Sequence, residues 1–226
     1  MIPLFFPEEL MVPVRFPGEA EDSWVNLIEE LNYNKMLFLF GELETELSNE
    51  IMALMLYLGM EDKTEPLYLF INSPGGEVIG GMALDNVMQY ILSPVITICL
   101  GIAASMASYI LAGGARRVAL PHARIKIHYF YAKLNKDEEE EKEKEKEKEK
   151  EKEKKKKKKK KKKGEDMDLL YAEFAEIMTL RENLARGYSE RTYKPLWIIY
   201  QDMERDVYMS ATEAQAYGIV DRVVGI

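Results

Sequence analysis

The sequence of 226 residues has little of the chemistry that metal sites and disulfide-stabilised proteins depend on, because it contains one cysteine and two histidines. Cys99 has no partner for an internal disulfide and lies in the apolar run VITICLG, so we expect a buried hydrophobic side chain. With no cysteine pair and only His122 and His128, a zinc site is not expected, and no other cofactor is indicated. The pattern G-x-x-x-x-G-K-[ST] is also missing, so the chain is not expected to bind ATP.

Long uncharged segments and targeting signals are scarce as well. The stretch from Asn86 to Ala115 carries no charge, but a proline and three glycines interrupt it. Its part from Val95 to Ile98 favours a buried strand and its later, Ala- and Met-rich part favours a helix, so no membrane span is expected. The N-terminal segment has acids at Glu8 and Glu9, no basic region and no Arg- and Ser-rich stretch, so neither a secretory signal nor a transit peptide is expected.

Apolar side chains are entirely missing from Lys136 to Lys163, where all 28 residues are Lys, Glu or Asp. Such a segment cannot offset the entropy of ordering it, so we expect a disordered or solvated insert, with Lys154 to Lys163 extended by mutual repulsion. The insert carries a net charge of +6, and the other 198 residues, with 28 acids and 14 bases, carry −14. An acidic body argues against nucleic acid as a partner, and its length suits one compact domain, residues 1–226, around the insert.

Short apolar runs alternate with helical periods, which predicts an α/β protein. Strands are expected at Met36–Phe40, Leu67–Ile71 and Val95–Leu100, each followed by a helix. The inward faces of these helices are expected to carry Leu47, Ile51, Leu54 and Leu58 in the first and Ala83, Val87 and Ile91 in the second, and the third helix covers Ser105–Ala112. Three successive strand-helix units imply right-handed crossovers and a mainly parallel sheet covered by helices.

The rest of the chain predicts further strands and helices. Two strands are expected at 117–120 and 124–130, before the insert. After it, an apolar stripe marks a long helix that ends near Gly187 to Ser189, with the stripe formed by Leu170, Phe174, Ile177, Leu184 and Tyr188. Pro195 can open another helix. Ser210 and Glu213 form the capping box of a short helix that Gly218 closes, and a last strand is expected at 219–224.

A serine lies where the third strand becomes a helix, in the junction Leu100-Gly-Ile-Ala-Ala-Ser105-Met106. Such a turn holds the hydroxyl at the sheet edge beside the N–H groups of the helix N-terminus, which suits a nucleophile, although an ordinary N-cap serine has the same pattern. The segment Asn72-Ser-Pro-Gly-Gly76 ends the preceding strand. Its paired glycines either allow the close backbone approach of an oxyanion hole or form a plain turn.

A nucleophilic serine needs a base, and two histidines are available. His128 shares an accessible strand face with Arg124 and Lys126, while Ile125 and Ile127 point the other way, and a neutral imidazole is a fitting proton acceptor. His122 follows Pro121 in a turn and is expected to be structural. The orienting acid stays open among many carboxylates.

Several segments together resemble one known family. The strings LYLFINSPGG, GIAASMAS, PHARIKIH and DMERDVYMSATEAQAYGIVD, with MQY and TIC between them, are similar to the proteolytic subunit of the Clp protease, and most similar to its plastid-encoded form. The resemblance runs from Pro13 to Val224 outside the insert. It implies a crotonase-like spiral with a handle of strand and long helix, two stacked heptameric rings of identical or paralogous subunits, and a location in the chloroplast stroma or, alternatively, the bacterial cytoplasm.

The resemblance also implies residue roles. It makes Ser105 the nucleophile, His128 the general base and Asp206 the orienting acid of a Ser-His-Asp triad, and it makes the amides of Gly76 and Met106 the oxyanion hole. Tyr68, Phe70 and Tyr90 correspond to the pockets in which a Clp-type hexameric ATPase docks. Core packing is the competing interpretation of these aromatic residues, above all of Phe70.

The chain departs from the family's pattern beside the histidine. The family continues I-H-Q-P into a glycine-rich handle that binds the peptide substrate, whereas this chain continues with Tyr129, Phe130 and Tyr131. Lys126 stands where an apolar residue is usual, and Tyr193 stands where a glycine is usual. These departures concern substrate positioning and ring stacking and leave the triad complete.

The implied function is that of the peptidase component of an ATP-dependent protease, a serine endopeptidase that hydrolyses unfolded polypeptides delivered by its ATPase. One rival is a structural ring subunit that cannot cleave. The other is an acyl-CoA enzyme of the crotonase fold, which shares an oxyanion hole but needs no such triad.

Overall fold

The computed structural model describes residues 10–15, 18, 21–61, 63–129 and 156–225. The chain divides into two compact units, one formed by Met1–Tyr129 with Ala185–Ile226 and the other by Phe130–Leu184. The first unit contains the sheet and every residue to which a site role was assigned. The second contains the insert and most of helix α6 (Lys156–Thr192).

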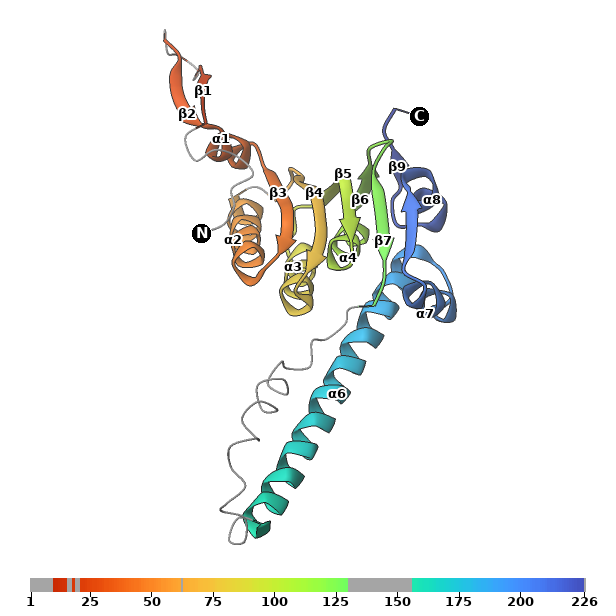
Figure 1. The fold of residues 1–226 in the computed structure, drawn as a ribbon. Helices are drawn as coiled ribbons and strands as arrows, with labels where there is room; N and C mark the ends of the chain where they lie inside the picture. Colours follow the sequence, from red (N-terminus) through yellow and green to blue (C-terminus); the bar gives the residue numbers. More distant parts are fainter. Residues whose placement is uncertain (1–9, 16–17, 19–20, 62, 130–155, 226) are drawn as a thin grey trace. The chain divides into compact units, whose positions relative to one another are not determined.

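The first unit is built on a mainly parallel sheet of seven strands, which confirms the predicted α/β class (Figure 1). The path β3-β4-β5-β6-β9 is parallel throughout, and β7 joins it by pairing with β5. The strands are β3 (Met36–Leu43), β4 (Leu67–Gly76), β5 (Val95–Ala104), β6 (Arg116–Ala119), β7 (Arg124–Ile127), β8 (Val207–Ser210) and β9 (Arg222–Val223). Strand β8 is antiparallel to β7 and was not predicted.

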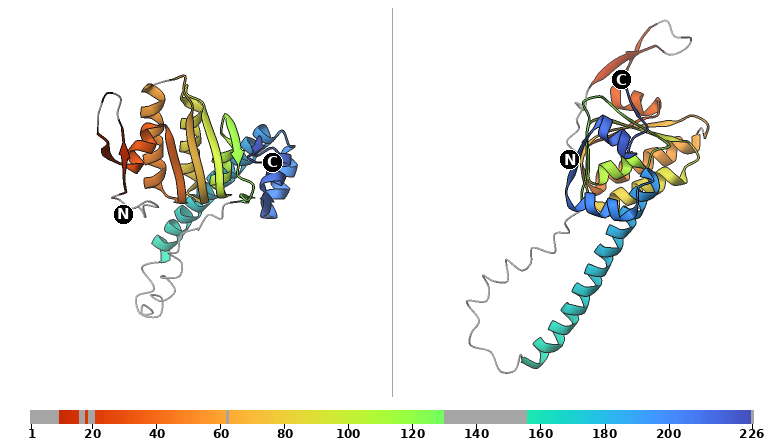
Figure 2. Two further views of the ribbon diagram at one scale, coloured as in Figure 1. Left: turned by 90° about the horizontal axis from the view of Figure 1, so that it is seen from above. Right: turned by 90° about the vertical axis from the view of Figure 1, so that its right-hand side faces the viewer.

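Three helices cross over between the first parallel strands, as the sequence predicts: α2 (Thr45–Glu61), α3 (Val78–Tyr90) and α4 (Met106–Ala112). They lie side by side in chain order along the sheet, and α4 packs on β4 and β5 (Figures 1 and 2). The core between these layers contains fully buried aliphatic side chains from every one of these strands and helices, among them Leu39, Met55, Leu69, Leu84, Cys99 and Ile110.

The prediction of which α3 residues face the core is wrong, because the buried face is shifted by one position along the helix. The buried residues are Gly81, Leu84, Asp85 and Met88, whereas Ala83, Val87 and Ile91 are only half-buried. The face includes a charged residue because Asp85 forms an ion pair with Arg191 of α6, with Oδ2 2.6 Å from Nη2. A carboxylate buried by a partner 106 residues away carries no local apolar signal.

Helix α6 differs from prediction at both ends. It begins at Lys156, so the prediction of an extended backbone is wrong for Lys156–Lys163, and 136–155 lies outside the described residues. At its other end it continues to Thr192 and so passes the predicted end near Gly187–Ser189. Of its predicted stripe, Leu184 and Tyr188 are buried and Phe174 is exposed.

The remaining elements complete the chain at both ends. Ahead of the sheet are a hairpin of β1 (Met11–Val14) and β2 (Ser23–Asn26) and helix α1 (Leu27–Tyr33), none of them predicted. Helix α7 (Leu196–Glu204) follows Pro195, and α8 (Ala211–Tyr217) has the predicted capping box and ends at Gly218 in the left-handed conformation. The last strand is shorter than predicted, and strand β7 ends at Ile127.

Arg117 of β6 binds the C-terminal segment, residues 218–224, to the sheet. Its guanidinium forms a hydrogen-bonded ion pair with Asp221 and donates to the carbonyl oxygens of Arg191 and Gly218 at 3.0 and 2.8 Å. The backbone continues this attachment, since β9 pairs with β6 and the amide of Val224 donates to Ala119.

Candidate active site

Ser105 occupies a strained turn between β5 and α4. Its φ of 55° and ψ of −128° lie in a region that residues with a side chain rarely adopt. Its hydroxyl forms no capping hydrogen bond with the helix, so the ordinary N-cap interpretation is wrong. Its amide donates to the carbonyl oxygen of Lys126 on β7 at 3.1 Å, which fixes the turn to the neighbouring strand. Ser105 is half-buried, and this strand-to-helix turn agrees with its predicted role as a nucleophile, which stays a prediction.

A buried hydroxyl pair holds the carbonyl side of this turn. Ser108 Oγ lies 2.7 Å from the carbonyl oxygen of Ser105 and 2.9 Å from that of Lys126, and it is 2.6 Å from the hydroxyl of Tyr188 on α6. Tyr188 OH also donates toward the Ser105 carbonyl at 3.3 Å. Burial raises the pKa of Tyr188, so its hydroxyl stays protonated and can donate. Sequence patterns do not find this pair, because its two members are 80 residues apart.

The glycine pair of the SPGG segment lies at the end of β4 rather than in a plain turn, because the strand continues through Gly76 and pairs with β3. Gly75 has a φ of 92°, and a Cβ added there would lie 2.6 Å from the Cβ of Ser105 and 3.0 Å from the amide nitrogen of Met106. The absence of a side chain therefore permits the close approach of β4 to the serine turn. Gly76 lies against Leu43 of β3, and its role as an oxyanion donor stays a prediction.

The β7–β8 pairing places His128 and Asp206 at one end of the sheet. Lys126 is opposite Tyr208 and Ile127 is opposite Val207, and His128 and Asp206 are the residues that directly follow β7 and directly precede β8. His128 is half-buried, and its Nδ1 lies 2.6 Å from the carbonyl oxygen of Tyr129. A carbonyl can only accept, so Nδ1 carries the hydrogen and Nε2 of the neutral ring is free to accept a proton.

The partner of Asp206 is a lysine. Oδ2 of Asp206 lies 3.1 Å from Nζ of Lys126, and Oδ1 is buried without a hydrogen-bond partner among the described residues. Asp206 has a φ of 54°, so the two proposed triad residues at chain turns, Ser105 and Asp206, are both held in the left-handed region. In the described part of the chain, hydrogen bonds join neither Ser105 to His128 nor His128 to Asp206.

The three residues assigned to docking are only partly brought together. Tyr68 and Phe70 alternate with buried leucines on β4 and share its other face, where Phe70 stacks on Phe38 with ring centroids 5.5 Å apart. Tyr68 lines a pocket of about 530 Å³ with Tyr33, Lys35, Asn34, Glu61, Glu65 and Pro66. Tyr90, at the end of α3, is 79% exposed and does not line this pocket. The core-packing interpretation therefore fits Phe70, which is half-buried and stacks on Phe38, but it does not fit the exposed Tyr90.

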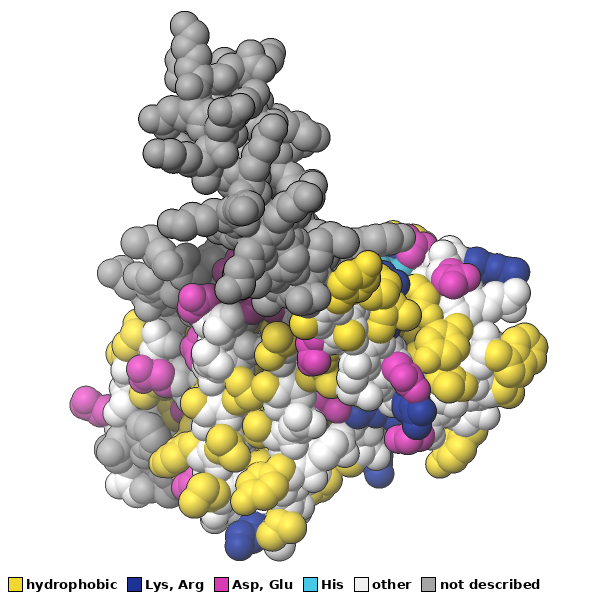
Figure 3. All heavy atoms as spheres, turned by 90° about the horizontal axis from the view of Figure 1, so that it is seen from below, with side chains coloured by type: hydrophobic (Ala, Val, Ile, Leu, Met, Phe, Trp, Pro, Cys, Tyr) yellow, Lys and Arg dark blue, Asp and Glu magenta, His cyan; other side chains and the backbone are white. Residues whose placement is uncertain are grey.

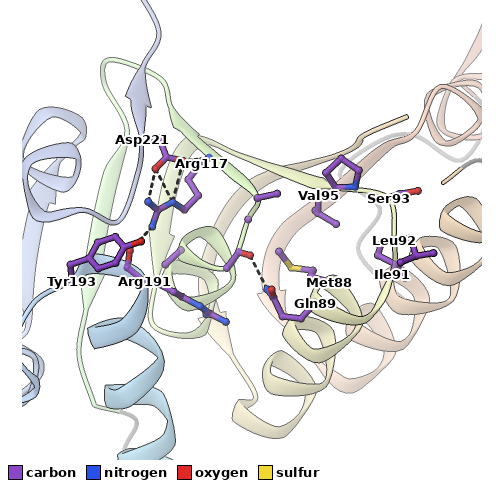
Figure 4. Close-up of a pocket in the computed structure, with 15 residues that line it drawn as sticks. Met88, Gln89, Ile91, Leu92, Ser93, Val95, Arg117, Arg191, Tyr193 and Asp221 are labelled. Atoms are coloured by element: carbon purple, nitrogen blue, oxygen red, sulfur yellow. Dashed lines mark hydrogen bonds and ion pairs between the residues drawn. The ribbon is translucent and has the colours of Figure 1, made fainter. Parts of the chain in front are cut away.

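A second pocket, of about 460 Å³, lies between the end of α3, the start of β5 and the end of α6 (Figure 4). Two arginines line it, but both are already engaged, Arg117 with Asp221 and Arg191 with Asp85. Gln89 donates to the Gly113 carbonyl at 2.8 Å across its floor. Among the described residues that line this pocket, both cations are therefore paired with carboxylates and neither is left for an anionic ligand.

Cys99 is fully buried on β5, as predicted, and burial raises the pKa of its thiol to about 12, so it is not a reactive thiol. His122 is exposed in the turn after β6, which matches its predicted place. Among the described residues no group of three or more acidic, His or Cys side chains is arranged to hold a metal ion. No helix in the described ranges is both long and apolar enough to cross a membrane.

Comparison with known proteins identifies relatives along almost the whole chain. The family model described as Clp protease matches residues 19–170 and 156–226. The chain is 46% identical over 218 residues to the chloroplastic ATP-dependent Clp protease proteolytic subunit 1 of Arabidopsis thaliana, an alignment that covers 94% of this chain and 95% of the relative. It is also 46% identical over 214 residues to the ATP-dependent Clp protease proteolytic subunits of Lactuca sativa and Nicotiana tabacum, with the same coverage.

Proposed function

Because the chain belongs to the Clp protease family, we propose that it is an ATP-dependent Clp protease proteolytic subunit that cleaves peptide bonds with Ser105, His128 and Asp206. The family has a crotonase-like fold, and the mainly parallel sheet with its crossover helices agrees with it. The acyl-CoA alternative loses its support, since the relatives along the chain are protease subunits.

The proposed reaction is acyl transfer followed by hydrolysis. Ser105 Oγ attacks the carbonyl carbon of the scissile peptide while His128 Nε2 takes the hydroxyl proton, and the amides of Gly76 and Met106 stabilise the negative charge on the carbonyl oxygen. The C–N bond then breaks as the imidazolium gives its proton to the leaving amine. Water, deprotonated by His128, hydrolyses the acyl-enzyme and returns the proton to Ser105.

The observation that carries this proposal is the strained Ser105 turn. A conformation at φ 55° costs of order 1–3 kcal/mol and persists only where the surroundings enforce it. Here the surroundings are the Lys126 carbonyl, the Ser108–Tyr188 hydroxyl pair and the side-chain-free Gly75. These contacts aim a hydroxyl that makes no structural bond of its own, which is the expected arrangement for a nucleophile.

Labelling with a fluorophosphonate tests the proposal. Wild-type protein should be labelled at Ser105 and should hydrolyse a short fluorogenic peptide, whereas Ser105→Ala should do neither and should assemble normally. Asp206→Asn should lower turnover by roughly four orders of magnitude, as a wrong imidazole tautomer does in other triads. Ser210→Ala is the matched control, because it removes the N-cap hydroxyl of α8 and lowers stability without touching the reaction.

The second candidate is a structural subunit of a mixed ring that does not cleave. It is favoured by the contacts of the two other triad residues, since His128 hydrogen-bonds to a main-chain carbonyl and Asp206 pairs with Lys126. A protein that assembles into rings with active subunits but leaves Ser105 unlabelled would support this alternative. Labelling at Ser105 at a rate like that of other serine peptidases would exclude it.

For assembly and partners, we propose two stacked heptameric rings of identical or paralogous subunits, a Clp-type hexameric ATPase that delivers unfolded polypeptides, and a location in the chloroplast stroma. Large apolar side chains are exposed on the first unit, including Tyr57, Met60, Ile79, Tyr90, Leu92 and Trp197. On the face drawn in Figure 3, hydrophobic side chains are exposed in several places between polar ones. Apolar surface of this kind marks interfaces with other chains.

Docking of the ATPase is proposed at Tyr68, Phe70 and Tyr90. Replacing Tyr68 or Tyr90 with Ala should weaken ATPase-stimulated degradation of a protein substrate more than hydrolysis of a short peptide, because these residues lie on surfaces away from Ser105. An equal loss of both activities would assign them to packing instead.

A further inference from the structure

We propose that Lys126 restrains the triad by binding its acid, so that Asp206 gives less support to the imidazolium form of His128. The inference rests on the proposed function, because it gives Lys126 a role in the reaction of Ser105. Lys126 is a positioning and electrostatic residue in this account and does not touch the substrate.

Three contacts hold the lysine in place. Its Nζ lies 3.1 Å from Asp206 Oδ2, and the lysine side chain is only 16% exposed. The same nitrogen lies 4.8 Å from the centroid of the Tyr208 ring, and Tyr208 is the residue opposite Lys126 in the β7–β8 pairing. Its carbonyl oxygen accepts from the amide of Ser105. Lys126 therefore connects the turn that carries the nucleophile with the carboxylate of the proposed acid.

The carboxylate has one oxygen left for the histidine. Oδ2 is taken by Lys126, while Oδ1 is buried and has no hydrogen-bond partner in the described part of the chain. His128 directly follows β7 and Asp206 directly precedes β8, next to the last pair of the ladder, yet the Nδ1 hydrogen of His128 is donated to the Tyr129 carbonyl. For the triad to form, His128 must exchange this carbonyl for Oδ1 of Asp206.

The charge of Lys126 then determines how strongly a hydrogen bond between His128 and Asp206 would stabilise the imidazolium. In the reaction His128 becomes positively charged, and the negative charge of Asp206 stabilises it. The ammonium of Lys126 lies against the same carboxylate and repels the imidazolium, so it offsets part of this stabilisation. Lys126 thereby lowers the stability of the transition state in which Ser105 loses its proton and His128 becomes charged.

The other charged and titratable groups on the surrounding elements do not make these contacts. On β7, Arg124 donates to the carbonyl oxygen of Ala123, and on β8 Tyr208 lies beside the ammonium. At the end of α7, Asp202 accepts from Tyr217, and Glu204 and Arg205 form no ion pair with Asp206 or His128. The described parts of β5 and α4 carry no charged side chain. Within the described ranges, Lys126 is thus the cation paired with Asp206.

The test compares Lys126→Met with Lys126→Arg in the full-length assembled protein. The measurement is kcat/KM for a short fluorogenic peptide between about pH 5 and 9. Lys126→Met should raise the plateau by about three- to tenfold and move the midpoint of the acid limb upward by roughly half to one pH unit, because the imidazolium regains the full charge of Asp206. Lys126→Arg should keep the wild-type plateau and midpoint. Lys126→Gln serves as a second neutral variant, and thermal melts check folding.

Arg124→Met is the matched control, since Arg124 lies on the same face of the same strand, donates to the carbonyl oxygen of Ala123 and acts with its charge on Glu213, and no ion pair joins it to Asp206 in the described chain. It should leave both the plateau and the midpoint unchanged. The inference would be overturned, with the triad intact, if the wild type is labelled and active while Lys126→Met and Lys126→Gln have the same kcat/KM plateau and the same acid-limb midpoint as the wild type. If wild type is unlabelled but Lys126→Met is labelled at Ser105, the restraint is complete and the inference stands. If neither is labelled, both the triad and the restraint are wrong.

Discussion

Ser108 gives the sharpest test of how the nucleophile is held, because its hydroxyl joins three partners at one buried point. Its single hydrogen is shared between the carbonyl oxygens of Ser105 and Lys126 at 2.7 and 2.9 Å, and its oxygen accepts from Tyr188 at 2.6 Å. Ser108→Ala removes two hydrogen bonds: the one that Ser108 donates, shared between the two carbonyl oxygens, and the one that it accepts from Tyr188. The buried Tyr188 hydroxyl then keeps only its longer contact with the carbonyl oxygen of Ser105. At about 1 kcal/mol for each net bond, the free energy of unfolding should fall by about 2 kcal/mol.

Ser108→Ala should affect the reactivity of Ser105 more strongly than it affects the free energy of unfolding. Without Ser108, the carbonyl of Ser105 loses the bond that stabilises its strained φ, and a small displacement of a nucleophile reduces its rate steeply. We expect the rate constant for fluorophosphonate labelling to fall roughly tenfold or more at temperatures where the variant is fully folded. Thermal unfolding and labelling kinetics on the same preparation measure both effects.

Ser189→Ala is the control for this experiment. It removes a serine hydroxyl from α6 that donates to the Lys194 carbonyl at 2.6 Å, so it makes the same chemical change without contact to the Ser105 turn. It should lower the unfolding free energy by about 1 kcal/mol and leave labelling unchanged. Wild-type labelling kinetics in Ser108→Ala would refute the idea that the hydroxyl pair positions the nucleophile.

Three further perturbations follow from the geometry. Gly75→Ala should abolish labelling, because the added Cβ would lie 2.6 Å from the nucleophile's Cβ, whereas Gly18→Ala, at a similar φ of 93° but with no atom within 4 Å, should remain active in the peptide assay. Arg191→Met should lower the unfolding free energy by about 3–5 kcal/mol in denaturation experiments, since Asp85, whose side chain is 8% exposed, loses its partner; Asp85→Asn in the same chain should restore part of it. Deleting 136–163, which also removes the first eight residues of α6, should leave ring assembly, measured by sedimentation, and peptide hydrolysis intact or improved, because a long polar insert adds little to the entropic cost of closing the chain around it; dissociation of the rings would show that the segment is structural.

The elements that depend on local patterns could be predicted from the sequence. Strands β3, β4 and β5 begin with apolar runs in which buried residues alternate with half-buried ones, and each lies where it was expected, although all three continue further than predicted. The capping box of α8 was found because Ser210 and Glu213 are three residues apart and bond each other directly.

What could not be predicted depends on contacts between distant segments. Strand β8 is four residues of mixed polarity whose sheet pairing comes from β7, a segment about 80 residues earlier in the chain. The buried face of α3 includes Asp85 because Arg191 arrives from α6. The start of α6 inside a lysine run contradicts the local expectation of repulsion.

The candidate site shows the same division. The motifs placed Ser105 correctly at the junction of β5 and α4, whereas His128 lies just after β7 and not within a strand that continues to 130 as predicted. The strain at Ser105 and the hydroxyls that support it are properties of the folded chain. The sequence marks Lys126 as an unusual residue for its position, but it does not predict the ion pair with Asp206, because the two residues are 80 positions apart.

The fastening of the C-terminal segment has a consequence for amide hydrogen exchange. Chain ends usually open and close freely, so their amides exchange within seconds or less, independently of the global unfolding of the protein. Here Arg117 bonds Gly218 and Asp221, and the amide of Val224 donates to Ala119 inside the sheet. Release of this end therefore requires the rupture of a bidentate ion pair and of strand pairing. The amides of residues 219–224 should exchange on the timescale of β5 and β6, so deuterium uptake at this end reports on the sheet itself.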